Sequence, residues 1–98
     1  MTVTVVSRLK GNHEDGLRIG RQIAPILKNH GATSVRFGYC HSGEYTGQLF
    51  GVTIYPDGAT YGRAMQALLE DTQYRQILGE ALKIVELQDR SVIITQDL

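Results

Sequence analysis

The fold is decided by the stretches TSVRFGYCH, residues 33–41, and QLFGVTIY, residues 48–55. Both are rich in β-branched and aromatic residues, which favour extended strands. The residues between them, SGEYTG at 42–47, are of the polar and glycine-containing kind that forms turns. Together the three segments predict an antiparallel β-hairpin.

The register of this hairpin is predicted from its large apolar residues. When His41 pairs with Gln48, all of these residues collect on one face, and a shift by one residue would scatter them over both faces. The expected cross-strand pairs are Val35 with Ile54, Phe37 with Val52, and Tyr39 with Phe50. The other face then carries Arg36 and two opposed glycines, Gly38 and Gly51.

A strand and a helix are expected before the hairpin. The β-branched run that starts at Thr2 predicts a strand to Leu9. Apolar residues then recur at helical spacing, with Asn12 or Asp15 as the cap at the start of the helix and Gly31 as the residue that ends it.

Two helices and a strand are expected after the hairpin. Asp57 is placed to cap a helix, and Asp71 to break it and cap a shorter one. The last strand is expected over 84–95, with a bulge or bend at the polar residues 89–91. The order βαββαβ, in a single domain over 1–98, predicts an α+β ferredoxin-like fold. Its four-stranded antiparallel sheet should carry two main helices on one face.

The composition limits the classes of function. The 98 residues include 10 basic and 10 acidic residues, their formal net charge is zero, and no basic block occurs, so no nucleic-acid partner is expected. No apolar run approaches the ~20 residues of a membrane span, and the first residues lack the pattern of a signal peptide. Cys40 is the only cysteine, which excludes an internal disulfide. These features favour a cytoplasmic protein with no membrane partner.

The sheet needs a second layer that the helices do not supply. Helices on one side leave the other face of the sheet bare, and that face is expected to carry Gly38, Cys40, Leu49 and Gly51, which is not a water-facing pattern. The same face of a second copy is the expected cover, so a homodimer is predicted. The bulky face is assigned to the helices because their small residues would accept it. These residues are Gly20, Ala24, Gly62, Ala64 and Ala67.

The helical segment YGRAMQALLEDTQY, Tyr61–Tyr74, adds a resemblance to a known group. With the element order and the sheet that needs cover, it resembles the dimeric α/β-barrel superfamily, which includes antibiotic-biosynthesis-monooxygenase-like and NIPSNAP-like proteins. The resemblance covers nearly the whole chain. It implies two sheets packed face to face and a small ligand held between sheet and helices. Cofactor-free monooxygenases of this group typically use tryptophan and asparagine in the pocket, and this chain has no tryptophan.

Two groups of residues are candidates for ligand binding. Tyr39, His41 and Tyr61 are expected at one end of a pocket under the helices, because tyrosine combines an apolar body with a polar tip. Arg36 and Tyr55 form the second group, on the face that carries the two glycines, and Arg36 is suited to clamp a carboxylate. The alternatives are that the first group only reaches water and that Arg36 pairs with an acidic residue across an interface.

No motif assigns a catalytic residue, a metal or a cofactor. His13, His30 and His41 lack the spacing of metal ligands. Cys40 has no base within reach, because on a strand its neighbour His41 points to the opposite face.

Two functions stay open. The first is an enzyme or binding protein for a small organic molecule, with its pocket between helices and sheet. The second is an interaction or stress-type dimer with a filled core and no active site. A cavity with two or more convergent polar groups would favour the first, and a closed core the second.

Overall fold

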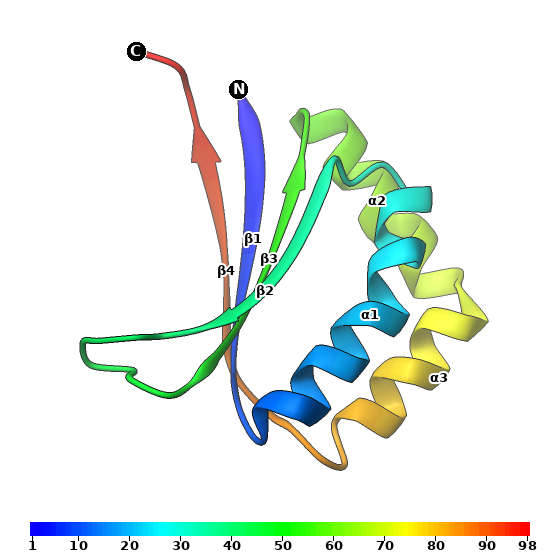
Figure 1. Cartoon of the computed structure of the whole chain (residues 1–98). Helices are drawn as coiled ribbons and strands as arrows, with labels where there is room; N and C mark the ends of the chain where they lie inside the picture. The colour runs from blue at the N-terminus through cyan, green and yellow to red at the C-terminus, as the bar shows by residue number, and fades with distance from the viewer.

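The computed structural model describes residues 1–98 and has the predicted βαββαβ order, with the second helical segment divided in two. The sheet is antiparallel throughout, with strand order β2-β3-β1-β4. All three helices lie on one side of it (Figure 1). The elements are β1 (Thr2–Lys10), α1 (His13–Asn29), β2 (Ser34–Tyr39), β3 (Leu49–Tyr55), α2 (Gly58–Glu70), α3 (Thr72–Ala81) and β4 (Glu86–Thr95).

The helix starts confirm the predicted caps. Asn12 Oδ1 accepts hydrogen bonds from the backbone N–H of Glu14 at 2.8 Å and of Asp15 at 3.3 Å. Asp57 Oδ1 accepts from the N–H of Thr60 at 2.7 Å. Each bond satisfies an amide that has no partner within its helix.

Asp71 joins three elements. Its Oδ1 accepts from the N–H of Tyr74 at 2.9 Å and so caps α3, as predicted. Its Oδ2 lies 3.0 Å from Nε2 of His30, which follows the end of α1. The hydrogen bond from His30, followed by that from the Tyr74 amide, holds the pKa of Asp71 below its ordinary value. Asp71 therefore ties the α2–α3 junction to the end of α1.

The predicted hairpin register is wrong by one residue. Tyr39 lies opposite Leu49, Phe37 opposite Gly51 and Val35 opposite Thr53. Gly38 consequently pairs with Phe50, and the opposed glycines do not exist. Beyond the strands, the Cys40 N–H donates to the Gln48 carbonyl at 2.9 Å, which fixes the same register at the turn.

The cause lies in β3, which is an inner strand with neighbours on both sides. The prediction gathered all large apolar residues of the hairpin on one face. In the structure, Leu49 and Tyr55 pack under the helices, while Phe50, Val52 and Ile54 alternate onto the other face. Both faces of the sheet are thus apolar, so the sorting of residues did not determine the register.

The assignment of the glycine face to a partner is corrected as well. Gly51 lies on the face under the helices, between Ser7 of β1 and Phe37 of β2. Gly38 lies on the other face, which we call the open face. Alternation from the observed pairs places five large apolar residues on the open face: Val6, Phe50, Val52, Ile54 and Ile93.

The last strand contains a bulge, one residue before the predicted range 89–91. The pairing of β1 with β4 shifts between Arg8, opposite Asp89, and Leu9, opposite Leu87, so Gln88 is the extra residue. This bulge twists β4 next to Arg90, which lies opposite Ser7.

The core under the helices forms two separate clusters. One joins Val3 and Tyr55 to Ala32 and Ala64, and the other joins Leu49 to Ala81 and Val85. Only nine hydrophobic residues of the 98 are buried, so the helix layer and the sheet are not in continuous contact. The candidate site described below lies between these two clusters.

Close contact between α1 and the sheet depends on Gly16. A Cβ at this position would lie 2.8 Å from Leu49 Cδ1 and 2.8 Å from Phe37 Cζ. Gly16→Val should therefore lower the free energy of unfolding by about 1–3 kcal/mol, as overpacking does. Urea unfolding followed by circular dichroism measures it.

The matched control for this substitution is Gly79→Ala in α3, where an added Cβ meets no atom within 4 Å. It should leave stability unchanged or raise it by up to about 1 kcal/mol, because alanine favours a helix over glycine. A Gly16→Val protein as stable as the wild type would contradict the observed packing of α1 on Phe37 and Leu49.

Candidate functional site: a pocket between the sheet and the helices

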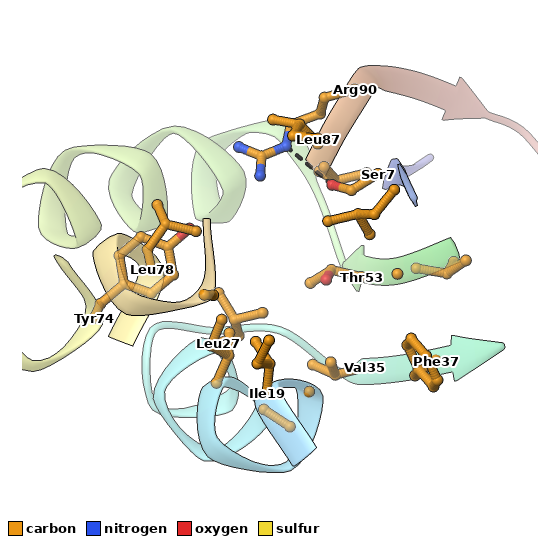
Figure 2. A pocket seen from close by; sticks show the side chains of 18 of the residues that line it. Ser7, Ile19, Leu27, Val35, Phe37, Thr53, Tyr74, Leu78, Leu87 and Arg90 are labelled. Atoms are coloured by element: carbon orange, nitrogen blue, oxygen red, sulfur yellow. Dashed lines mark hydrogen bonds between the residues drawn. The ribbon is translucent and has the colours of Figure 1, made fainter. Parts of the chain in front are cut away.

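A pocket of about 570 Å³ lies between the sheet and the helix layer. Figure 2 shows it with side chains from the strands on one side and from α1 and α3 on the other. Of its 31 lining residues, 22 are hydrophobic, so the space suits a largely apolar occupant.

The floor of the pocket is hollow because its central residues are small. One row across the sheet runs from Arg90 on β4 through Ser7 and Gly51 to Phe37 on β2. A Cβ added to Gly51 would meet no atom within 4 Å. The two smallest side chains of this row therefore lie in its middle, and its two largest lie at the ends.

The walls come from the helices and from the edge of β4. Ile19 and Leu27 of α1 and Leu78 of α3 face the space in Figure 2. Other apolar lining residues are largely exposed to solvent. Their exposed fractions are 70% for Leu69, 49% for Leu82 and 41% for Leu87. These leucines mark an apolar mouth through which the pocket meets solvent.

The polar lining consists of hydroxyl groups and arginines. The hydroxyls belong to Ser7, Thr53, Tyr55, Tyr61 and Tyr74, and the cations to Arg21, Arg36, Arg75 and Arg90. No aspartate, glutamate, histidine or cysteine is among the lining residues. The side chains of the pocket can therefore donate hydrogen bonds and stabilise negative charge, but they include no carboxylate, imidazole or thiol.

Tyr55 is the buried member of the tyrosine group, with 1% of its surface exposed. Its ring meets that of Tyr61 edge to face at a centroid distance of 5.6 Å. Burial raises the pKa of Tyr55, Tyr74 and Tyr61 raise it further, and the charge of Arg90 opposes them. Tyr55 thus stays a neutral phenol and a hydrogen-bond donor at physiological pH.

Arg90 Nε donates a hydrogen bond to Ser7 Oγ at 3.0 Å. In Figure 2 this bond is the dashed line, and the rest of the guanidinium points into the pocket. Arg90 forms no ion pair in the structure, whereas Arg8 on the open face is paired with Asp89 at 2.6 Å.

The structure brings together some of the predicted binding residues and separates others. Tyr55 and Tyr61 meet in the pocket, and Arg36 borders it, although alternation turns its side chain to the open face. Tyr39 and His41 do not line it. Tyr39 is 58% exposed, and its ring packs against the ring of His13 at 5.5 Å.

The predicted convergence of Tyr39 and His41 with Tyr61 is therefore wrong. Tyr39 pairs with Leu49 at one end of β3, while Tyr61 contacts Tyr55 at the other end. A strand of this length separates its ends by roughly 20 Å, because each residue adds about 3.3 Å. Whether any of the five predicted residues binds a ligand stays a prediction.

Sequence reasoning missed Ser7, Tyr74 and Arg90. A signal for two of them existed. Ser7 interrupts the alternating apolar residues of β1, which predicts a small polar gap on the buried face. Arg90 alternates with Val92 and Ile94 and so shares their face. Tyr74 carried no such signal, because only the position of α3 brings it to the pocket.

The structure presents no group of three or more His, Cys, Asp or Glu side chains that could hold a metal ion. None of its helices combines the length and the hydropathy needed to cross a membrane.

Comparisons with known proteins place the chain in a fold group. The model of the family described as a domain of unknown function, DUF6854, matches residues 1–94. No curated protein matches the chain.

Several solved structures share the fold. An uncharacterized NIPSNAP domain protein from Burkholderia xenovorans has a TM-score of 0.76 at 17% identity, over 98% of this chain and 95% of that one. The SnoaB variant from Streptomyces nogalater, described as a cofactor-independent oxygenase, has a TM-score of 0.74 at 11% identity, over 99% and 95%. A dimeric ferredoxin-like protein from an uncultured marine organism has 0.68 at 11%, over 98% of each. These likenesses confirm the expected ferredoxin-like fold and its resemblance to monooxygenase-like and NIPSNAP proteins.

Proposed function

The chain belongs to the family described as a domain of unknown function, DUF6854, and we propose that it binds a small, largely apolar organic molecule in the pocket between its sheet and its helices. The observation that carries this proposal is the open space of about 570 Å³ between two separate core clusters. Ligand sites of small molecules are typically concave, about 300–1,000 Å³ in volume, and lined by apolar residues with a few polar groups.

The floor of the pocket supports the same proposal. A chain selected only for stability gains from filling its core, because each unfilled methyl-sized space costs about 1 kcal/mol. Gly51 and Ser7 instead have small side chains that leave space unfilled at the centre of the floor. The alternative of a dimer with a filled core and no active site has less support, because it leaves this space unexplained.

The neighbours in fold are compatible with binding or conversion of a ligand. SnoaB is described as a cofactor-independent oxygenase. In this chain, the phenols of Tyr55, Tyr61 and Tyr74 and the guanidinium of Arg90 are the groups placed to orient a bound molecule. The proposal assigns these four residues to ligand binding and requires no cofactor.

We also propose that the protein is a homodimer joined through its open face. All helices lie on the other side of the sheet, so Phe50, Val52 and Ile54 have no helix over them and remain partly exposed. Two such sheets can pack face to face, which would bury roughly 2,000 Å² in a stable dimer. One solved structure of this fold is described as dimeric. The single free cysteine, Cys40, agrees with a reducing, cytoplasmic location.

Filling the floor of the pocket tests the ligand proposal. Gly51→Leu adds a side chain where a Cβ has open space, so the protein should fold while the pocket becomes smaller. A compound that raises the Tm of the wild type in a thermal-shift screen should bind this variant at least about tenfold more weakly, a loss of 1.4 kcal/mol. Isothermal titration calorimetry gives both affinities.

Gly62→Leu is the matched control, because Gly62 lies exposed on α2 and its Cβ also meets no atom. This variant should keep wild-type affinity. Equal affinity of the wild type and folded Gly51→Leu for every hit would show that the pocket is not the binding site.

A charge on the open face tests the dimer. Val52→Asp should shift the protein toward the monomer of 10.9 kDa, because burying a carboxylate in an apolar interface is strongly unfavourable. Sedimentation equilibrium at tens of micromolar should give twice that mass for the wild type. Gln66→Asp, on the exposed side of α2, should leave the dimer intact. A monomeric wild type would defeat the proposal, as would a Val52→Asp protein that remains fully dimeric.

A further inference from the structure

The Arg90 side chain is held by one hydrogen bond and forms no ion pair. It lies on the pocket side of β4, opposite Ser7, and its neighbours on that side along the strand are apolar. Its Nε–H is engaged by Ser7 Oγ at 3.0 Å, which fixes the plane of the guanidinium. Its two terminal nitrogens have no protein acceptor, although they are the donors that point into the pocket (Figure 2).

No acidic residue near Arg90 forms an ion pair with its guanidinium. Its neighbour Asp89 points to the open face, where it accepts from Nε of Arg8 at 3.2 Å and from the second terminal nitrogen of Arg8 at 2.6 Å. No carboxylate lines the pocket. Arg90 is itself exposed to solvent, so its unpaired charge lies at the rim of a mostly apolar space, where the acid group of a bound molecule can reach it.

From this arrangement we propose that the ligand is an organic carboxylate, with its acid group held by the free edge of the Arg90 guanidinium and its apolar body inside the pocket. The inference rests on the proposed function, since it specifies the ligand of the same pocket. A guanidinium offers two parallel N–H donors, which match the two oxygens of a carboxylate.

The surroundings of Arg90 favour a carboxylate over a phosphate. Of the four lining arginines, Arg90 alone is fixed by a side-chain hydrogen bond, so one guanidinium edge is preorganised, whereas a doubly charged phosphate usually requires several cations or a helix N-terminus. The charge of Arg90 lowers the pKa of Tyr55, but burial raises it more, so the phenol stays protonated. The apolar lining residues Ile19, Val35 and Leu78 then contact the aromatic or aliphatic part of the ligand.

Matched acids and amides test the inference. Titration calorimetry would compare 2-naphthoate with 2-naphthamide, and decanoate with decanamide, on the wild-type protein. In the pair that binds more tightly, the acid should be preferred by about two- to fivefold, because Arg90 is exposed and water screens an ion pair at that position. Raising the salt concentration should weaken the acid more than the amide.

The key variant is Arg90→Met, which keeps an apolar stem and removes the guanidinium. It should abolish the preference for the acid, because the acid loses an ion pair while the amide loses at most one hydrogen bond to its neutral carbonyl. Arg90→Lys keeps the charge but not the two-donor edge, so it should retain only part of the preference. The control Arg63→Met alters an exposed arginine of α2 outside the pocket and should change neither affinity.

The outcomes separate the inference from the proposed function. If acid and amide bind equally to the wild type, or if Arg90→Met keeps the preference, the carboxylate inference is wrong. The pocket function then still stands, provided that Gly51→Leu weakens both compounds. If no acid or amide binds the wild type even at millimolar concentration, both the carboxylate inference and the proposed ligand-binding function are contradicted.

Discussion

The structure depends on how its sheet is covered: three helices lie on one face of the four-stranded sheet, and no helix lies on the other. Each inner strand must therefore present an apolar surface twice. On β3, Leu49 and Tyr55 meet the helices, and Val52 and Ile54 meet whatever lies on the open face. On β1, Val3 and Val5 face the helices, and Val6 faces away. This division leaves the open face without a helix layer, which is why we propose that a second copy covers it.

The local elements could be predicted because their signals are local. Asp57 and Asp71 were identified as caps from residue type and position, and Asn12 was one of two candidates with Asp15. Asn12, Asp57 and Asp71 each accept the expected backbone hydrogen bond. The bulge near Gln88 followed from polar residues inside an apolar strand. The register of the hairpin could not be predicted in this way. Alternation alone distinguishes registers only when one face is polar, and here both faces are apolar.

The site was harder to predict than the fold, because its residues come from elements far apart in the sequence. Tyr61 was expected in the pocket because it lies on the apolar stripe of the second helix. Tyr55 was expected with Arg36 on the glycine face, but it lies under the helices, whereas the Arg36 side chain alternates to the open face. Arg90 and Ser7 become neighbours only through the pairing of β1 with β4. The register error had a further effect. It moved Gly51 to the wrong face, and with it the one position that makes the floor of the pocket hollow.

The central claim is that the space under the helices is a ligand site. The most direct measurement is a methyl-labelled NMR titration with a hit from a small-molecule screen. We expect shifts for methyl groups that face the pocket, at Ile19, Val35 and Leu78, with much smaller changes at Ile54 and Ile93 on the open face. Shifts confined to the open-face methyls would contradict it, because the molecule would then bind on the far side of the sheet.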